Sequence, residues 1–226
     1  MEYFNDAWVI AVLQIIAIDI VLGGDNAIII ALACRNLPKH QRRAGIIWGA
    51  AGAIILRVIM VFFATNLMEV SGLRMIGGIL LIWIGVKLLT DGETQNLDGK
   101  INQSSNLLTA IRTIIIADFV MSLDNALAIT AAAKGDIGLV VFGLLLSVPI
   151  IIWGSALILR LMARFPVIIT AGAGLLGWLG GGLMISDKLL AEFIAMSPPA
   201  TSTMATAIGA IFVIAIDRFF AKPKPE

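Results

Sequence analysis

The chain has 226 residues, of which 59% are hydrophobic and 14% are charged, and its mean hydropathy is +0.99. This balance excludes an ordinary soluble domain and is typical of a polytopic membrane protein, whose partner is the lipid bilayer. The net charge of +1, without an extended basic patch, argues against a nucleic-acid partner, and the single cysteine, Cys34, excludes an internal disulfide and a cysteine-rich metal site.

Seven segments are apolar over about the 20 residues that a membrane span requires: 8–33, 44–64, 70–89, 108–133, 137–160, 167–186 and 204–220. Backbone amides in lipid must be bonded within their own segment, and spans of this length do not suit barrel strands. We therefore expect an all-α membrane protein of about seven helices. Segments 8–33 and 108–133 are longer than the hydrocarbon core is thick, which predicts a tilt or a break in each.

The basic residues predict the orientation. Twelve of the 16 Lys and Arg residues lie in or beside the segments 34–43, 87–112, 160–164 and 218–224, whereas the opposite side has Arg74, Lys134 and Lys188. Because cytoplasmic loops are enriched in Lys and Arg, we expect the N-terminus outside and the C-terminus in the cytoplasm.

One motif occurs twice. Residues 19–27 and 118–126 share the pattern D-x-V-x-x-x-D-N-A, and three spans around the first copy resemble three around the second. An odd number of spans in each half makes the halves run in opposite directions, which predicts an inverted repeat. The expected parts are a first repeat at 1–90, a flexible cytoplasmic linker at 91–106, a second repeat at 107–186, and an extracytoplasmic loop, last helix and tail at 187–226.

The motif places acidic side chains in the middle of apolar spans. Each such Asp costs about 2.5–3.5 kcal/mol, so a functional role is expected. The alternative is that protonated Asp residues only hold neighbouring helices together by hydrogen bonds. With the halves inverted, the two copies meet near mid-span, and the predicted set of metal ligands is Asp19, Asp25, Asn26, Asp118, Asp124 and Asn125.

A regular helix points Asp19 and Asp25 about 120° apart. Gly23 and Gly24 lie between them and would allow a kink that turns both toward one centre. The second copy has Ser122 and Leu123 instead of the glycine pair, so a break is less expected there. Ser147 and Pro149 are a further, weaker sign of a kink, in segment 137–160.

Oxygen donors suit hard or borderline divalent cations such as Mn²⁺, Mg²⁺ and Ca²⁺, and no His or Cys is available for zinc or copper. Met121 is an accessory candidate as a sulfur ligand, but its counterpart Leu22 favours packing. Repulsion among four carboxylates suggests exchange of protons for metal. Arg57, the one basic residue well inside a span, is predicted to neutralise a carboxylate, to guard the ion pathway, or to snorkel to the surface. No organic cofactor is expected.

The paired motifs, Asp19, Asp25 and Asn26 with Asp118, Asp124 and Asn125, resemble those of the TerC family of integral membrane proteins, within the LysE-type transporter superfamily. The resemblance covers nearly the whole chain. It implies a manganese exporter of the plasma membrane whose metal-binding residues are these Asp and Asn positions, in a family also associated with tellurite resistance.

Two alternatives to a transporter stay open. An intramembrane aspartyl protease would use two membrane carboxylates to activate water, but the two equivalent D-x5-D-N units leave its Asn residues without a role. A non-transporting metal-binding scaffold or sensor would use the same site without ion movement. A homo-oligomer is compatible with the sequence.

Overall fold

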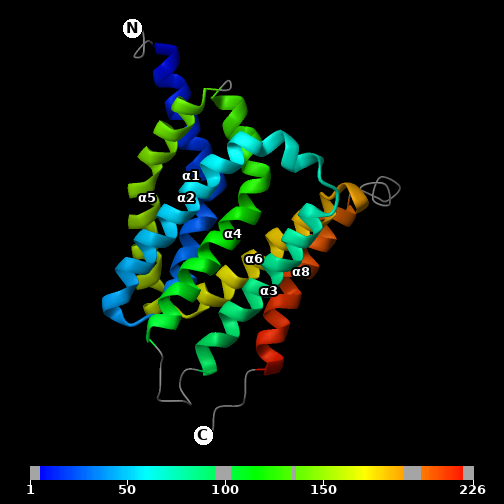
Figure 1. The fold of residues 1–226 in the computed structure, drawn as a ribbon. Helices are drawn as coiled ribbons and strands as arrows, with labels where there is room; N and C mark the ends of the chain where they lie inside the picture. The colour runs from blue at the N-terminus through cyan, green and yellow to red at the C-terminus, as the bar shows by residue number, and fades with distance from the viewer. Residues whose placement is uncertain (1–5, 95–102, 134–135, 191–199, 221–226) are drawn as a thin grey trace, which may run out of the picture. The chain divides into compact units, whose positions relative to one another are not determined.

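The computed structural model describes residues 6–94, 103–133, 136–190 and 200–220, and within these ranges the chain is helical without strands (Figure 1). The predicted all-α class is confirmed. The helices are α1 (Asp6–Cys34), α2 (Lys39–Glu69), α3 (Leu73–Thr94), α4 (Gln103–Ala132), α5 (Ile137–Arg164), α6 (Val167–Ile185) and α8 (Ala200–Phe220).

Some helix boundaries differ from the prediction. α3 begins at Leu73 rather than at residue 70, because Gly72 has a φ of +86°, a backbone conformation that starts a turn and suits glycine. α3 and α4 also extend into the predicted linker, at 91–94 and 103–106, so helix occupies part of a segment that was predicted to be flexible. The rest of that linker, 95–102, and residues 191–199 of the predicted loop lie outside the described residues.

Membrane-spanning length is clear for four helices: α2 over Lys39–Ala64, α3 over Leu73–Thr90, α5 and α6. The apolar part of α8, Thr203–Ile216, is shorter, and the predicted count of seven spans stays a prediction.

α1 and α4 are each bent near the motif. The two parts of α1, Trp8–Val21 and Gly24–Cys34, meet at 47°, as the glycine pair suggested. The two parts of α4, Leu107–Leu123 and Asn125–Ala132, meet at 64°, so the second copy is also bent although it lacks the glycine pair. A Ser-Leu-Asp-Asn run contains residue types that compete for backbone hydrogen bonds, which favours a break without glycine.

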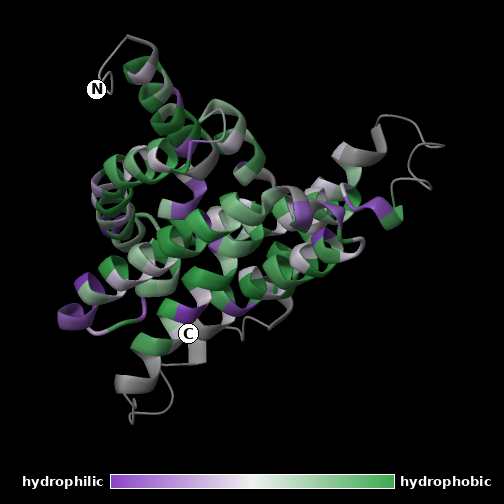
Figure 2. Ribbon diagram, turned by 45° about the horizontal axis from the view of Figure 1, so that its top comes forward, coloured by the Kyte–Doolittle hydropathy of each residue, from purple (hydrophilic) through white to green (hydrophobic). Residues whose placement is uncertain are grey.

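The outer surface of the helices is apolar. Figure 2 shows hydrophobic residues along the lengths of the helices, and large side chains such as Trp153 and Trp48 are 71% and 65% exposed. Apolar surface of this extent would be unfavourable in water, so its surroundings are the bilayer.

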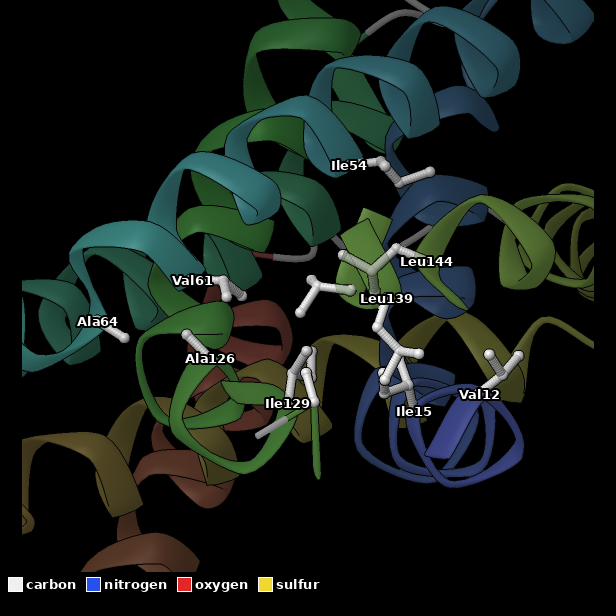
Figure 3. Packing of buried hydrophobic residues seen from close by; sticks show 11 residues of the cluster. Val12, Ile15, Ile54, Val61, Ala64, Ala126, Ile129, Leu139 and Leu144 are labelled. Carbon is white, nitrogen blue, oxygen red and sulfur yellow. The ribbon is translucent and has the colours of Figure 1, made fainter. Parts of the chain in front are cut away.

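The helices form two compact units, and each predicted repeat contributes to both. The first unit comprises residues 1–69 and 107–159, and therefore holds α1, α2, most of α4 and most of α5. Its core brings together apolar side chains from these four helices, among them Ile15, Val61, Ile129 and Leu144 (Figure 3). This packing fixes the positions of the helices that carry the motif.

The second unit, residues 70–106 and 160–226, is built from α3, α6 and α8 packed on one another. Glycines set their spacing. A Cβ atom added at Gly177 of α6 would lie 2.3 Å from the Gly209 carbonyl oxygen of α8, and one added at Gly78 of α3 would lie 2.4 Å from the Gly180 oxygen. The backbones are therefore in direct contact, as small residues allow between membrane helices.

Candidate functional site

Three buried charges meet inside the first unit. α1 supplies Asp19, α4 supplies Asp118 and α2 supplies Arg57, and their exposed fractions are 2%, 4% and 2%. Arg57 donates from Nη1 to Asp19 Oδ1 and from Nη2 to Asp118 Oδ1, so one guanidinium joins the first aspartate of both motif copies. The planar fork of Arg suits such a double contact, which a Lys ammonium does not reproduce.

Two serines complete the hydrogen bonding of this group. Arg57 Nε donates to Ser122 Oγ at 3.1 Å, and the Ser122 hydroxyl lies 3.2 Å from Asp118 Oδ2 as its donor. The Ser147 hydroxyl contacts Asp19 Oδ2 and lies 2.8 Å from the Leu144 carbonyl. Each aspartate thus has one oxygen bound by Arg57 and the other by a serine hydroxyl, which compensates for the loss of water on burial.

In the second half of the first motif copy, by contrast, buried polar atoms lack a described hydrogen-bond partner. Asp25 Oδ1 and both side-chain polar atoms of Asn26 are buried, and none of them has a hydrogen-bond partner among the described residues. Asp25 is within electrostatic reach of Arg57 and Asp118. Asn26 and Asp118 line one small cavity, of about 10 Å³, with four apolar side chains from α1, α2 and α4. Such unpaired groups cost about 1–3 kcal/mol each, which makes them candidates for contact with a bound ion or water.

The second copy is described less fully. Asn125 and Met121 are half-buried, and the side chain of Asp124 lies outside the described part of the chain. Gly24 has open space where a Cβ would stand. The roles predicted for these residues stay predictions.

The predicted four-carboxylate site stays a prediction, because the side chain of Asp124 lies outside the described part of the chain. Within the described residues, no group of three or more His, Cys, Asp or Glu side chains is placed to hold a metal ion. Arg57 lies between Asp19 and Asp118 instead. Of the three predictions for Arg57, the contacts agree with neutralisation of a carboxylate, burial argues against snorkelling, and a role in guarding the pathway stays a prediction.

Sequence reasoning missed the contact made by Ser147, which it treated only as a sign of a kink. A polar residue in the apolar run FGLLLSVPIII is a signal, but a serine in a membrane helix commonly bonds to the carbonyl of its own preceding turn. Ser147 does this and also contacts Asp19 on another helix. The sequence does not show whether a serine in a membrane helix bonds only within its own helix or also contacts another helix.

Comparison with known proteins agrees with the motif. The family model described as "Integral membrane protein TerC family" matches residues 4–225. The chain belongs to the TerC family. The resemblance inferred from the paired Asp and Asn residues is therefore confirmed over nearly the full length.

Several TerC-like relatives carry similar sequences. The "Uncharacterized membrane protein YjbE" of Bacillus subtilis (strain 168) is 43% identical over 188 residues, which are 83% of this chain and 85% of YjbE. YkoY of the same organism is 25% identical over 80% of this chain and 59% of its own length. The "UPF0053 inner membrane protein YgdQ" of Escherichia coli (strain K12) is 30% identical over 58% of this chain and 60% of YgdQ. No solved structure matches the chain.

Proposed function

We propose that this TerC-family protein is a transporter that moves divalent metal cations, above all Mn²⁺, out of the cytoplasm. The observation that carries the proposal is the meeting of Asp19 and Asp118, from two different helices, next to the unpartnered oxygens of Asp25 and Asn26. Buried acidic groups within membrane spans typically belong to ion pathways.

The donor set favours the class of ion. Carboxylate, amide and hydroxyl oxygens are the ligands of Mn²⁺, Mg²⁺ and Ca²⁺. Among the described residues, the His and Cys side chains are remote from this group in sequence: His40 is exposed at the start of α2, and Cys34 ends α1. The proposed ligands are Asp19, Asp25, Asn26, Asp118, Asp124 and Asn125, with the ion as substrate rather than as a resident cofactor.

The proposed setting is the plasma membrane, with the N-terminus outside and the C-terminus in the cytoplasm, as the distribution of Lys and Arg favours. Export against a gradient requires a coupling ion or the membrane potential, and we propose exchange with protons. Neither an organic cofactor nor an enzymatic activity belongs to the proposal.

The test is Mn²⁺ uptake by everted membrane vesicles that contain the full-length protein. Asp19→Asn and Asp118→Asn are expected to reduce the initial rate at least tenfold, because each removes a charge from the ion's position. Asp136→Asn is the matched control, since this aspartate is exposed and bonds to the Leu139 amide at the start of α5. Equal rates in all three variants and the native protein would rule out this site.

Geometry argues against a protease, which needs two carboxylates that share a proton and a water, because a guanidinium lies between Asp19 and Asp118. The vesicle assay separates the other alternative. A metal-binding scaffold or sensor would bind Mn²⁺ in an aspartate-dependent way but would show no flux in vesicles.

A further inference from the structure

We propose that Arg57 is a tethered competitor of the transported ion: its guanidinium occupies the position between Asp19 and Asp118, and a divalent cation binds there only by displacing it. The inference rests on the proposed function, because it names what the ion replaces at the same site.

The geometry makes the two cations mutually exclusive. Arg57 binds the Oδ1 atom of each aspartate and the hydroxyl of Ser122. A divalent ion bridging the two carboxylates would need oxygen contacts of about 2.0–2.6 Å on the same side. A guanidinium and a divalent ion cannot share these oxygens in a buried site, where like charges repel far more strongly than in water.

Charge balance favours the exchange for a divalent ion. Two ionised aspartates with one guanidinium carry a net charge of −1, and the same pair with a divalent ion is neutral. A displaced guanidinium also has a candidate acceptor, because Asp25 Oδ1 is buried without a described partner and the next residue, Asn26, lines one cavity with Asp118. Arg57 therefore need not be left as an unpaired buried charge, which would be prohibitive.

The same comparison predicts selectivity against monovalent ions. Na⁺ or K⁺ carries the charge of the guanidinium but brings no gain in neutralisation, and it would have to break three hydrogen bonds of Arg57. Arg57 is therefore expected to keep monovalent ions from binding between Asp19 and Asp118 while a divalent ion can displace it.

The experiment measures Mn²⁺ binding to the purified full-length protein at one pH, with ionic strength set either by NaCl or by choline chloride. Arg57→Gln is expected to bind Mn²⁺ at least tenfold more tightly in choline chloride than the native protein, and to lose much of this gain in NaCl. Ser122→Ala removes the acceptor of Arg57 Nε and the hydroxyl donor to Asp118 Oδ2, keeps every charge, and is expected to tighten binding several-fold because Arg57 is held less firmly. Arg42→Gln is the matched control. Arg42 donates to the carbonyls of Leu37 and Arg35, which precede α2, so no change in Mn²⁺ affinity is expected.

A purely structural clamp predicts the reverse. If Arg57→Gln and Ser122→Ala bind Mn²⁺ equally or more weakly than the native protein, while native binding still requires Asp19 and Asp118, the competition is refuted and the proposed function stands. If native binding does not depend on these aspartates, both proposals fail. Should Arg57→Gln not fold, the result with Ser122→Ala decides.

Discussion

Asp19 and Asp118 are each bonded at both carboxylate oxygens, whereas Asp25 Oδ1 and the Asn26 amide have no described partner at all. The motif thus has one part whose buried polar atoms are hydrogen-bonded and one part whose buried polar atoms lack described partners. Removing one partner from a buried ion pair typically costs about 3–5 kcal/mol, so Arg57 also contributes to the stability of the first unit. The unpaired groups lower stability, and such a cost is common where a protein binds a ligand.

Ser147 offers a test of the hydrogen bonding around Asp19. Ser147→Ala leaves Asp19 Oδ2 without its hydroxyl partner, and we expect a loss of about 1–3 kcal/mol in unfolding free energy and slower Mn²⁺ uptake. Ser155→Ala is the matched control, because this serine is equally buried on α5 but bonds only within the helix, to the Ile151 carbonyl at 2.7 Å. Thermal unfolding in detergent and vesicle uptake are the measurements, and indistinguishable behaviour of the two variants would contradict the assigned contact.

Asp187, outside the spans, offers a test by pH. Burial raises the pKa of its carboxyl, but the backbone N–H groups of Leu189, Gly72 and Met75, at 2.9, 2.9 and 3.1 Å, outweigh burial and hold the pKa below its ordinary value of 3.8. A lowered folded-state pKa stabilises the fold above pH 3.8, and this stabilisation disappears as the pH falls through the folded-state value.

The native protein is therefore expected to unfold at a higher temperature than Asp187→Asn at pH 7, and the gap is expected to close as the pH falls below 3.8. The measurement is thermal unfolding of both proteins in detergent between pH 7 and pH 3. A gap that does not change with pH would mean that the carboxylate charge is not what the amides bind.

At the scale of the elements, the sequence predicted helices better than it predicted their bends. Long apolar runs identify spans because lipid leaves the backbone no other partner. A bend depends instead on which backbone hydrogen bonds are lost. The length of both segments predicted a tilt or a break in each, and the glycine pair located the bend in α1, but nothing in the sequence indicated that the bend in α4 is the larger one. Both bends fall inside the motif, where they change the direction of Asn26 and Asn125 relative to the preceding turns.

The contact between α6 and α8 gives a prediction at this scale. Gly177→Ala would place a Cβ atom 2.3 Å from the Gly209 carbonyl oxygen, which is backbone and cannot yield, so we expect a loss of about 1–3 kcal/mol in stability. Gly182→Ala on the same helix meets only the Thr206 methyl at 3.2 Å and should cost less. Thermal unfolding in detergent compares the two, and a larger loss for Gly182→Ala would contradict the described packing.

For the whole molecule, the sequence predicted the class, the helices and the family, but not how the helices group. The repeats at 1–90 and 107–186 stay predictions, and the first two helices of each predicted repeat belong mostly to one compact unit, a grouping that the repeat pattern did not indicate. Hydropathy reports that a segment lies in lipid, but its neighbours depend on side-chain shape. For the same reason the bonds from Gly72 and Met75 to Asp187 have no sequence signature, since backbone amides of any residue type could make them.

Orientation is also a property of the whole chain. In a Cys34→Ala background, Lys188→Cys is expected to react with a membrane-impermeant thiol reagent added to intact cells, and Lys39→Cys only after the membrane is permeabilised. Both lysines are exposed, and replacing Cys34, the single cysteine of the chain, leaves the introduced thiol as the one that can be labelled. The opposite pattern would invert the predicted topology and the direction of transport.

The most direct test of the central claim, that aspartates from α1 and α4 form one cation site, is a double-mutant cycle of Mn²⁺ binding to the purified protein. Asp19→Asn, Asp118→Asn and the double variant are compared by equilibrium binding. A shared site predicts that either single change weakens binding nearly as much as both together. Independent, additive losses, or unchanged Mn²⁺ binding in the double variant, would contradict it.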